Sequence, residues 1–246
     1  MNLEVQRGTL LADQAHGWGQ LVHAASGVGR VQTTTAHWVL PAARALWVPP
    51  HERPQLHCVT ALSLRTLYFA PHALPDLPVR CTVLTLSPLL KDLVLATAGR
   101  APLEDGPHQE GRLLSVLRDE LSAAPREPLA LPMPRGSAAR RLANRILGEP
   151  GARRSIDEWC KGCGASRRTL ERRFREETGT SLGEWLRQAR LQHAVVGLTE
   201  GRSVTQVAEE VGYSSASAFV QAFRLAYGTT PGRWVSPMLA RGAEPR

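Results

Sequence analysis

Two stretches of this chain, 48 residues apart, repeat one pattern of apolar and polar positions. In each stretch the apolar side chains occur at i, i+3, i+4 and i+7, which places them on one face of a short helix. A glycine follows at once, and glycine permits the sharp turn that ends such a helix. The apolar positions and the glycine are Ile156, Trp159, Cys160, Cys163 and Gly164 in the first stretch, and Val204, Val207, Ala208, Val211 and Gly212 in the second.

A second amphipathic segment follows each turn and carries an apolar pair four residues apart. The pairs are Leu170 with Phe174, and Phe219 with Phe223. A helix, a turn and a second helix make a helix-turn-helix, whose second helix enters the major groove of DNA. The repeat therefore predicts two DNA-reading units, which meet two successive grooves.

The remainder of the C-terminal half also carries helix signals. Capping boxes at Ser155 and Ser203 open the first helix of each unit, because a glutamate or a glutamine follows three residues later. Further helices are predicted over 137–148, Ser166 to about Glu177, Ser181 to about Leu198, and from Pro231. Together they predict an all-α module over residues 137–237.

The N-terminal half has the short apolar segments and turn residues that are typical of strands. Many short strands at close spacing favour a sandwich or a barrel. From Ser87 the period becomes helical, and residues 125–136 contain four prolines, which favour an extended linker. The predicted strands are 21–24, 29–33, 38–40, 45–48 and 62–69.

These patterns predict an α+β chain with a small β-barrel in residues 1–86 and a helical hairpin in 87–124, ahead of the linker and the all-α module. The second hairpin helix carries an apolar stripe that is too wide for a lone surface helix, so we expect a homodimer formed through 87–124. The alternative is that the stripe docks on the barrel of its own chain. The stripe consists of Leu113, Leu114, Leu117 and Leu121.

The positive charge is confined to the half that contains the repeat. Residues 1–134 hold 11 basic and 11 acidic side chains, whereas residues 135–246 hold 19 and 11, a net charge of +8. Nearly all of the basic residues are arginine, which suits phosphate and guanine recognition. A preference for arginine codons would explain arginine over lysine but not the segregation, so we expect one domain for DNA and one for another ligand.

Several classes of protein are disfavoured. No apolar run approaches the roughly 20 residues of a membrane span, and the N-terminus lacks the pattern of a signal peptide. The four cysteines have no disulfide-framework spacing, which favours a reducing cytoplasm. Cys160 and Cys163 have metal-site spacing, but there is no second pair and both fall on an apolar face, so we expect core packing.

Four motifs in the C-terminal 100 residues resemble the AraC/XylS family of bacterial transcription regulators. A weaker resemblance, carried by Trp47-Val48-Pro49-Pro50 and Leu64-Arg65-Thr66-Leu67-Tyr68, links the first 90 residues to the cupin-type sensor half of that family. The resemblance implies a β-barrel of the cupin jelly-roll type, a helical hairpin and a seven-helix DNA module. The motifs are Ser166-x-x-x-Leu170-x-x-x-Phe174-Arg175-x-x-Thr178-Gly179-x-Ser181, Trp185-x-x-x-x-Arg190-Leu191-x-x-Ala194, Val207-Ala208-x-x-Val211-Gly212-Tyr213-Ser214 and Phe219-x-x-x-Phe223-Arg224-x-x-Tyr227-Gly228-x-x-Pro231.

The resemblance implies that Arg168, Glu171 and Arg172 face the bases in the first unit. Arginine suits guanine and glutamate suits cytosine, so a G·C-rich half-site is expected. A solvated face with pairs such as Glu171–Arg175 is the alternative. The expected phosphate contacts are Arg167, Arg173 and Arg175.

The second unit is expected to discriminate less, or mainly to pack and position. Only Ser217 and Gln221 of its outward residues can hydrogen-bond a base, while Ala216 and Val220 suit a thymine methyl group and Arg224 lies near the DNA backbone.

In the N-terminal half, the resemblance to cupins raises a metal question. His16 and Gln20 stand at ligand positions, but Gln14 and Pro54 replace two expected histidines, with His51 and His57 nearby. We therefore expect no metal and no cofactor. Three tryptophans are candidates for an apolar effector pocket, or they simply fill the barrel. They are Trp18, Trp38 and Trp47.

The sequence as a whole predicts a cytoplasmic regulator that binds double-stranded operator DNA and responds to a small effector, with RNA polymerase as a further partner. The alternative is a cupin-type metal-dependent enzyme with an appended DNA-binding module. A non-specific architectural DNA-binder is disfavoured by Glu171, because a carboxylate in the reading stripe repels phosphate.

Overall fold

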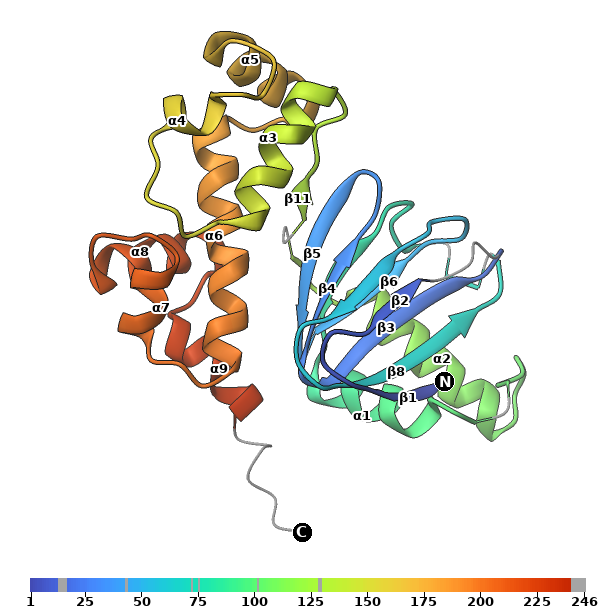
Figure 1. Ribbon diagram of the computed structural model, residues 1–246. Coiled ribbons are helices and arrows are strands. Elements are labelled where there is room, and N and C mark those ends of the chain that lie inside the picture. Colours follow the sequence, from blue (N-terminus) through green and yellow to red (C-terminus); the bar gives the residue numbers. More distant parts are fainter. Residues whose placement is uncertain are drawn as a thin grey trace. The chain divides into compact units, whose positions relative to one another are not determined.

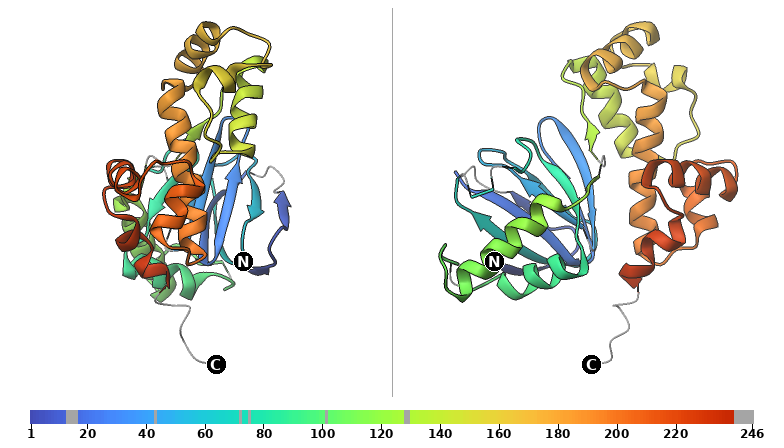
Figure 2. Two further views of the ribbon diagram at one scale, coloured as in Figure 1. Left: turned by 60° about the vertical axis from the view of Figure 1, so that its left-hand side comes forward. Right: turned by 180° about the vertical axis from the view of Figure 1, so that it is seen from behind.

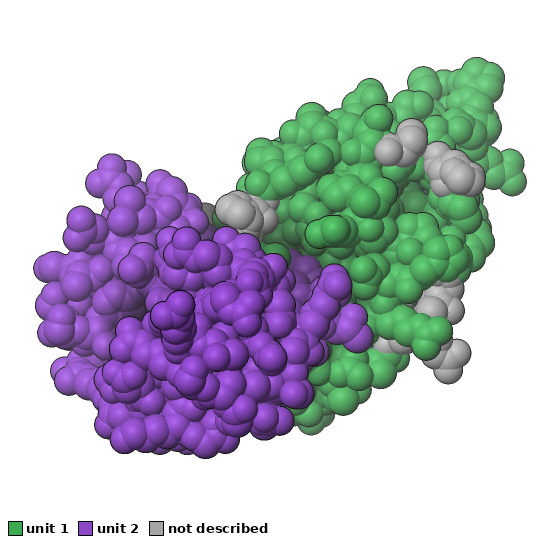
Figure 3. Space-filling view, turned by 90° about the horizontal axis from the view of Figure 1, so that it is seen from above, with its two compact units in different colours: residues 1–33, 39–130 green, residues 34–38, 131–246 purple. Residues whose placement is uncertain are grey.

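The chain divides into two units, coloured separately in Figure 3. The first unit comprises residues 1–33 and 39–130, and the second comprises 34–38 and 131–246. The computed structural model describes residues 1–12, 17–42, 44–71, 73–74, 76–100, 102–127 and 130–239, with the backbone alone at 236–239. Strands dominate the first unit and helices the second, as expected for an α+β chain.

Two antiparallel sheets form the body of the first unit. The larger sheet has the order β1 (Asn2–Val5), β8 (Leu62–Phe69), β3 (Gly19–Ser26), β6 (Arg44–Val48), β9 (Thr82–Thr85) and β10 (Arg126–Glu127). The smaller sheet contains β5 (Ala36–Pro41), β4 (Val28–Gln32), β7 (Gln55–Cys58) and β2 (Leu10–Ala12) in that order. Two separate sheets therefore replace the closed barrel that the sequence predicts.

The larger sheet uses its two faces differently, because successive side chains on a strand point to opposite sides. One face packs against helices α1 (Pro88–Thr97) and α2 (Gln109–Ala123), which lie beside this sheet in Figure 2. Leu21, Trp47 and Phe69 belong to the core on that face. The rings of Trp47 and Phe69 meet edge to face with centroids 6.1 Å apart. The opposite face of this sheet looks toward the smaller sheet.

The leucine stripe of α2 belongs in part to this core. Leu117 is 2% exposed and Leu121 is fully buried, and both pack in the cluster with Leu21 and Trp47. The prediction that these two leucines form a dimer interface is therefore wrong, since the sheet of their own chain covers them. Leu113 and Leu114 remain partly exposed beside them.

The proline-rich segment 125–136 contributes strands to both units. Arg126 and Glu127 pair with Leu84 and Val83 in β10 and β9. Strand β11 (Leu131–Pro132) pairs with residues 36 and 37 at the start of β5, which group with the second unit. The segment is therefore held by hydrogen bonds at both ends, which an extended linker alone would not be.

One long helix organises the second unit. Helix α6 (Leu182–Thr199) runs between α3 (Ser137–Gly148), α4 (Ile156–Cys160) and α5 (Arg167–Thr178) at one end, and α7 (Val204–Glu210), α8 (Ala216–Tyr227) and α9 (Pro231–Leu239) at the other, as Figure 1 shows. All seven helices were expected from the sequence. No helix in the described ranges is both long and apolar enough to cross a bilayer.

Replacing Leu117 tests whether this residue of α2 is part of the core of the first unit. Leu117→Ala leaves a cavity under α2 and is expected to lower the free energy of unfolding by about 2–5 kcal/mol. Val79→Ala removes an apolar side chain that is 88% exposed elsewhere in the first unit, and should change stability by less than about 0.5 kcal/mol. Urea unfolding followed by circular dichroism measures both, and equal effects would contradict this placement of the helix.

Candidate nucleic-acid interface

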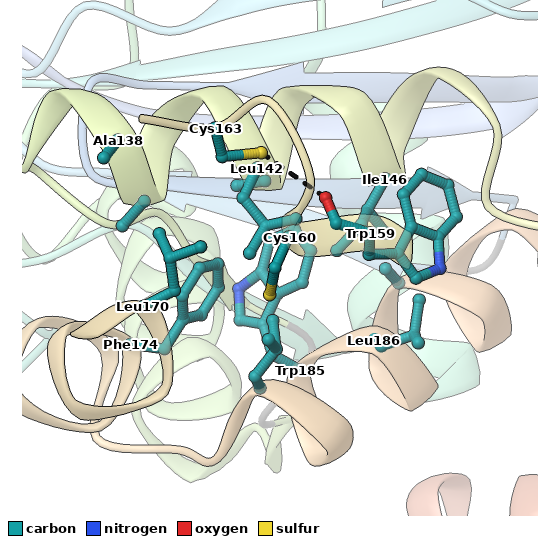
Figure 4. Packing of buried hydrophobic residues seen from close by; sticks show 14 of the residues in the cluster. Ala138, Leu142, Ile146, Trp159, Cys160, Cys163, Leu170, Phe174, Trp185 and Leu186 are labelled. Atoms are coloured by element: carbon teal, nitrogen blue, oxygen red, sulfur yellow. Dashed lines mark hydrogen bonds between the residues drawn. The ribbon is translucent and has the colours of Figure 1, made fainter. Parts of the chain in front are cut away.

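The first helix-turn-helix is fixed by a tightly packed apolar core, shown in Figure 4. Trp159 of α4, Phe174 of α5 and Trp185 of α6 are all fully buried in it. The rings of Phe174 and Trp185 meet edge to face at 5.4 Å, and the Trp185 indole donates to the Pro132 carbonyl at 2.6 Å. Because the inner face of α5 is fixed in this way, the residues on its outer face are determined too.

Cys160 and Cys163 belong to the same core. They are 6% and 3% exposed, and the Cys163 thiol donates to the Trp159 carbonyl at 3.4 Å. The two sulfur atoms point in different directions: the Cys160 sulfur points toward Trp185, and the Cys163 sulfur points toward the Trp159 carbonyl (Figure 4). Burial raises the pKa of the Cys160 thiol, which disfavours the thiolate that metal binding needs. The prediction that this pair packs in the core is confirmed.

Capping residues set the start of most helices in the second unit. Both predicted capping boxes are present, with the Ser155 N–H donating to Glu158 at 2.8 Å and the Ser203 N–H donating to Gln206 at 3.1 Å. The bond from the Ser155 main chain lowers the pKa of Glu158, so this carboxylate stays ionised at the positive end of α4. A third box joins Ser181 and Glu184 at the start of α6.

Several arginines of the second unit serve the scaffold. Arg141 donates to the Cys163 carbonyl at 2.9 Å and Arg145 to the Lys161 carbonyl at 2.6 Å, so both hold the turn after α4. Arg190 donates to two carbonyls of the segment 150–152, each at 3.1 Å. Only part of the excess positive charge is therefore available for DNA.

The outer face of α5 presents Arg168, Arg172 and Arg175, which are all exposed. Their spacing of four and three residues places them along one stripe, opposite Leu170 and Phe174, which are fully buried. Arg168 makes no ion pair with any residue that the structure describes, whereas Arg172 pairs with Glu176 at 3.0 Å. The stripe expected to face DNA is thus present and solvent-accessible.

Arg167 and Glu171 are joined by an ion pair on the flank of that stripe. The guanidinium of Arg167 lies 2.9 Å from Glu171 and 2.9 Å from Asp157 of α4. Glu171 therefore pairs with Arg167, in place of the Glu171–Arg175 pair considered from the sequence. All three side chains are at least 43% exposed, so the pairs are weak and solvent-screened, and a phosphate group can displace them.

The second helix-turn-helix repeats the design of the first. Helix α8 is capped by Ser215 and ends at Gly228 with φ 73°, just as α5 is capped by Ser166 and ends at Gly179 with φ 75°. Its buried face carries Phe219 and Phe223, which contact further aromatic rings. These rings are Tyr213, Tyr227 and Trp234, with centroids 4.4 to 5.8 Å away.

The outward residues of α8 differ from those of α5. Ser217, Gln221 and Arg224 are exposed at spacings of four and three residues, while Ala216 and Val220 are partly buried. This stripe has one cation, whereas α5 has three, so the second unit offers less charge and fewer hydrogen-bonding groups to DNA.

Three of the weak metal candidates, Gln20, His51 and His57, lie in the described part of the chain, on different elements. Gln14 and His16 lie outside the described residues, His51 is exposed in a turn with φ 71°, and His57 is exposed on β7. Gln20 is buried on β3. Within the described ranges, no three His, Cys, Asp or Glu side chains are grouped as metal ligands.

A cavity between the two sheets of the first unit was not expected at its observed position. Trp47 packs toward α1 and α2, Trp38 is 3% exposed, and Trp18 is 50% exposed, and none of the three is among the cavity's lining residues. None of the three tryptophans that the sequence offers for an effector pocket therefore lines this cavity. The period of two along Leu64, Thr66 and Tyr68 was the available signal, because alternate residues share a face.

Comparison with known proteins relates both halves of the chain to one family. Residues 6–144, more than half of the chain, match a family described as AraC-like ligand binding domain, and residues 159–236 match one described as helix-turn-helix domain.

Individual relatives are similar over most of the chain or over less than half of it. The chain is 31% identical to the HTH-type transcriptional regulator NimR of Escherichia coli over 221 residues, 90% of this chain and 81% of NimR. It is 32% identical to the regulator RipA of Corynebacterium glutamicum over 112 residues, 46% of this chain and 34% of RipA. It also resembles the solved DNA-binding domain of AdpA in complex with a target DNA, with 27% identity, 44% of this chain and 100% of that chain covered, and a TM-score of 0.41.

The ion pair between Arg172 and Glu176 predicts that removing the charge of Glu176 changes the affinity for DNA. Glu176→Gln releases Arg172 and removes a negative charge beside the stripe, so it should strengthen DNA binding at low salt by about 0.2–1 kcal/mol. Glu104→Gln removes the same charge from an exposed site in the first unit and should have a smaller effect, because it releases no arginine of the α5 stripe. Fluorescence anisotropy with labelled DNA compares the two, and an equal gain in both variants would refute the local role of Glu176.

Proposed function

Because this chain belongs to the AraC family of helix-turn-helix transcription regulators, we propose that it reads an operator through two successive major grooves under the control of a small effector. Membership makes it a DNA-binding regulator with a ligand-binding domain. The cupin-type enzyme finds no support among its relatives, which are regulators, and we propose that the chain is not an enzyme. We assign its action to the cytoplasm, where promoter DNA is accessible.

The observation that carries this proposal is the placement of two equivalent helix-turn-helix units on one helix. Helix α6 has 18 residues, which correspond to about 27 Å of helix axis. The α4–α5 unit packs at one end and the α7–α8 unit at the other (Figure 1). With the width of the flanking helices added, α5 and α8 approach the spacing of one DNA turn, about 34 Å.

The two reading helices take unequal roles in the proposal. In α5, Arg168, Glu171 and Arg172 contact bases, and Arg168 leads because it has no ion pair to break within the described part of the chain. Phosphates are contacted by Arg167, Arg173 and Arg175. In α8, Ser217 and Gln221 hydrogen-bond bases, Ala216 and Val220 meet thymine methyl groups, and Arg224 contacts the backbone.

The first unit supplies regulation in this proposal. An effector that binds one arrangement of the units better than another shifts the population toward that arrangement, and so changes DNA affinity.

We propose that the chain forms a homodimer through the exposed side of residues 87–124, where Leu89 is 51% and Val116 is 42% exposed. RNA polymerase is the partner expected at a promoter. The proposed boundaries are 1–86 for the sensor, 87–124 for the hairpin, 125–136 for the connection and 137–237 for the DNA-binding domain.

Two arginine variants test the assignment of base and phosphate contacts. Arg168→Ala should weaken binding to the operator by about 1–3 kcal/mol and relax the base preference at one position. Arg173→Ala should weaken binding to operator and random DNA alike, and reduce the slope of log affinity against log salt by about one unit. The operator is first selected from random DNA with the full chain, and affinities are then measured over a salt series.

The two variants serve as controls for each other, because each removes one guanidinium from α5. If Arg168→Ala and Arg173→Ala lowered operator and random-DNA affinity by the same factor, the proposed orientation of α5 on DNA would be incorrect.

A further inference from the structure

The first unit contains a cavity of about 200 Å³ between its two sheets, most of whose strands are labelled in Figure 1. The larger sheet lines it with alternate residues of β3, β6 and β8, and the smaller sheet with residues of β2, β4 and β7. These are the residues that face away from α1 and α2, because side chains alternate across a strand. The cavity is therefore a product of the two-sheet arrangement and is separate from the core under the helices.

The lining is mostly aliphatic. Eight leucine and valine side chains surround the space, and the described lining contains no Asp, Glu, Lys, Arg or His side chain. The leucines and valines are Leu3, Leu11, Val22, Val31, Leu46, Val48, Leu56 and Leu64. A ligand that fits this lining gains by removing apolar surface from water.

Three polar side chains interrupt the aliphatic lining. Gln20 and Thr66 are 3% and 4% exposed, and Tyr68 is 45% exposed. The Thr66 hydroxyl makes no hydrogen bond to another residue in the described part of the chain. Met1 is also among the lining residues; its ammonium group is bound to the Thr66 carbonyl at 2.6 Å, and burial lowers the pKa of that group. The polar side chains of the described lining are therefore few and lie on the neighbouring strands β3 and β8.

The volume limits the size of an occupant. An apolar protein cavity of about 150 Å³ holds one benzene molecule. The present cavity is somewhat larger, which corresponds to roughly six to ten non-hydrogen atoms by the same comparison. Pockets for larger organic ligands have about 300–1,000 Å³.

The chemistry of the lining excludes two ligand classes. A sugar of similar size carries several hydroxyl groups, and most of them would be desolvated against aliphatic side chains without a partner. A doubly charged or strongly acidic molecule would lose its hydration, and the described lining offers no side-chain counter-charge to replace it.

We infer that the effector is a small, uncharged and mostly apolar molecule, such as a substituted benzene, whose single hydrogen-bonding group meets the Thr66 hydroxyl. This inference rests on the proposed function, because it identifies the class of ligand that the sensor unit binds. The hydroxyl of Thr66 is the partner that distinguishes a polar-substituted ring from a plain hydrocarbon.

The test uses the full chain and four probes, which are benzyl alcohol, toluene, benzoate and glucose. Isothermal titration calorimetry measures binding without DNA, so that a failure of DNA binding does not affect the result. We expect benzyl alcohol to bind more tightly than toluene, and benzoate and glucose to bind at least ten-fold more weakly than benzyl alcohol. Tighter binding of glucose or benzoate, or no binding of either aromatic probe to the folded protein, would overturn the inference.

Two variants locate the binding in the cavity. Val22→Phe fills space at a partly buried lining position and should weaken benzyl alcohol binding at least ten-fold. Val79→Phe makes the same change at a position that is 88% exposed and should leave binding unchanged. Thr66→Val keeps the side-chain shape and should abolish the preference for benzyl alcohol over toluene.

Circular dichroism establishes that each variant is folded before titration. If Val22→Phe does not fold, the result for Thr66→Val alone decides whether the ligand binds in the cavity. Unchanged benzyl alcohol binding in Val22→Phe, or an unchanged preference in Thr66→Val, would place the ligand elsewhere and overturn the inference.

Discussion

The burial of α6 is the constraint on which the DNA-binding unit depends. Eleven of its 18 residues are buried, so it is apolar around most of its circumference and needs cover from several sides. Helices α3 to α5 cover one end and α7 to α9 cover the other. Since each group contains a helix-turn-helix, the length of α6 sets the separation of the two reading helices, and the apolar pairs within them set which residues face outward.

Arginine has two tasks in this unit. Arg141, Arg145 and Arg190 donate to main-chain carbonyls and hold turns in place, whereas Arg168 and Arg175 extend from α5 with no ion pair in the described part of the chain. Net charge alone therefore overstates the charge that is available to DNA. The asymmetry between α5, with three outward arginines, and α8, with Arg224 alone, is the physical basis for unequal discrimination by the two units.

The helices of the second unit could be predicted from the sequence because their signals are local. A serine cap, a partner three residues later and a glycine at the end lie within one helix, as at Ser155 and Glu158. Strands β1, β2, β7 and β9 could not be identified, since they have only three or four residues and owe their existence to pairing with distant strands. The outward stripe of α5 could be predicted from the spacing of its arginines.

The contacts that a helix or an aromatic side chain makes with distant parts of the chain were harder to predict. The stripe on α2 indicates an apolar partner but not which one, and the sheet of the same chain covers Leu117 and Leu121. The positions of Trp18, Trp38 and Trp47 were likewise ambiguous, because an aromatic residue fits either face of a sheet. The ion pair of Arg167 with Asp157 joins two helices, and sequence spacing does not reveal such pairs.

The central claim is that one chain reads two successive major grooves. Hydroxyl-radical and base-methylation footprinting of the full chain on its selected operator tests this claim most directly. The account predicts two protected major-groove segments on one face of the duplex, with centres separated by about 10–10.5 base pairs for each bound chain. A single protected segment for each chain, or two segments on opposite faces of the duplex, would contradict it.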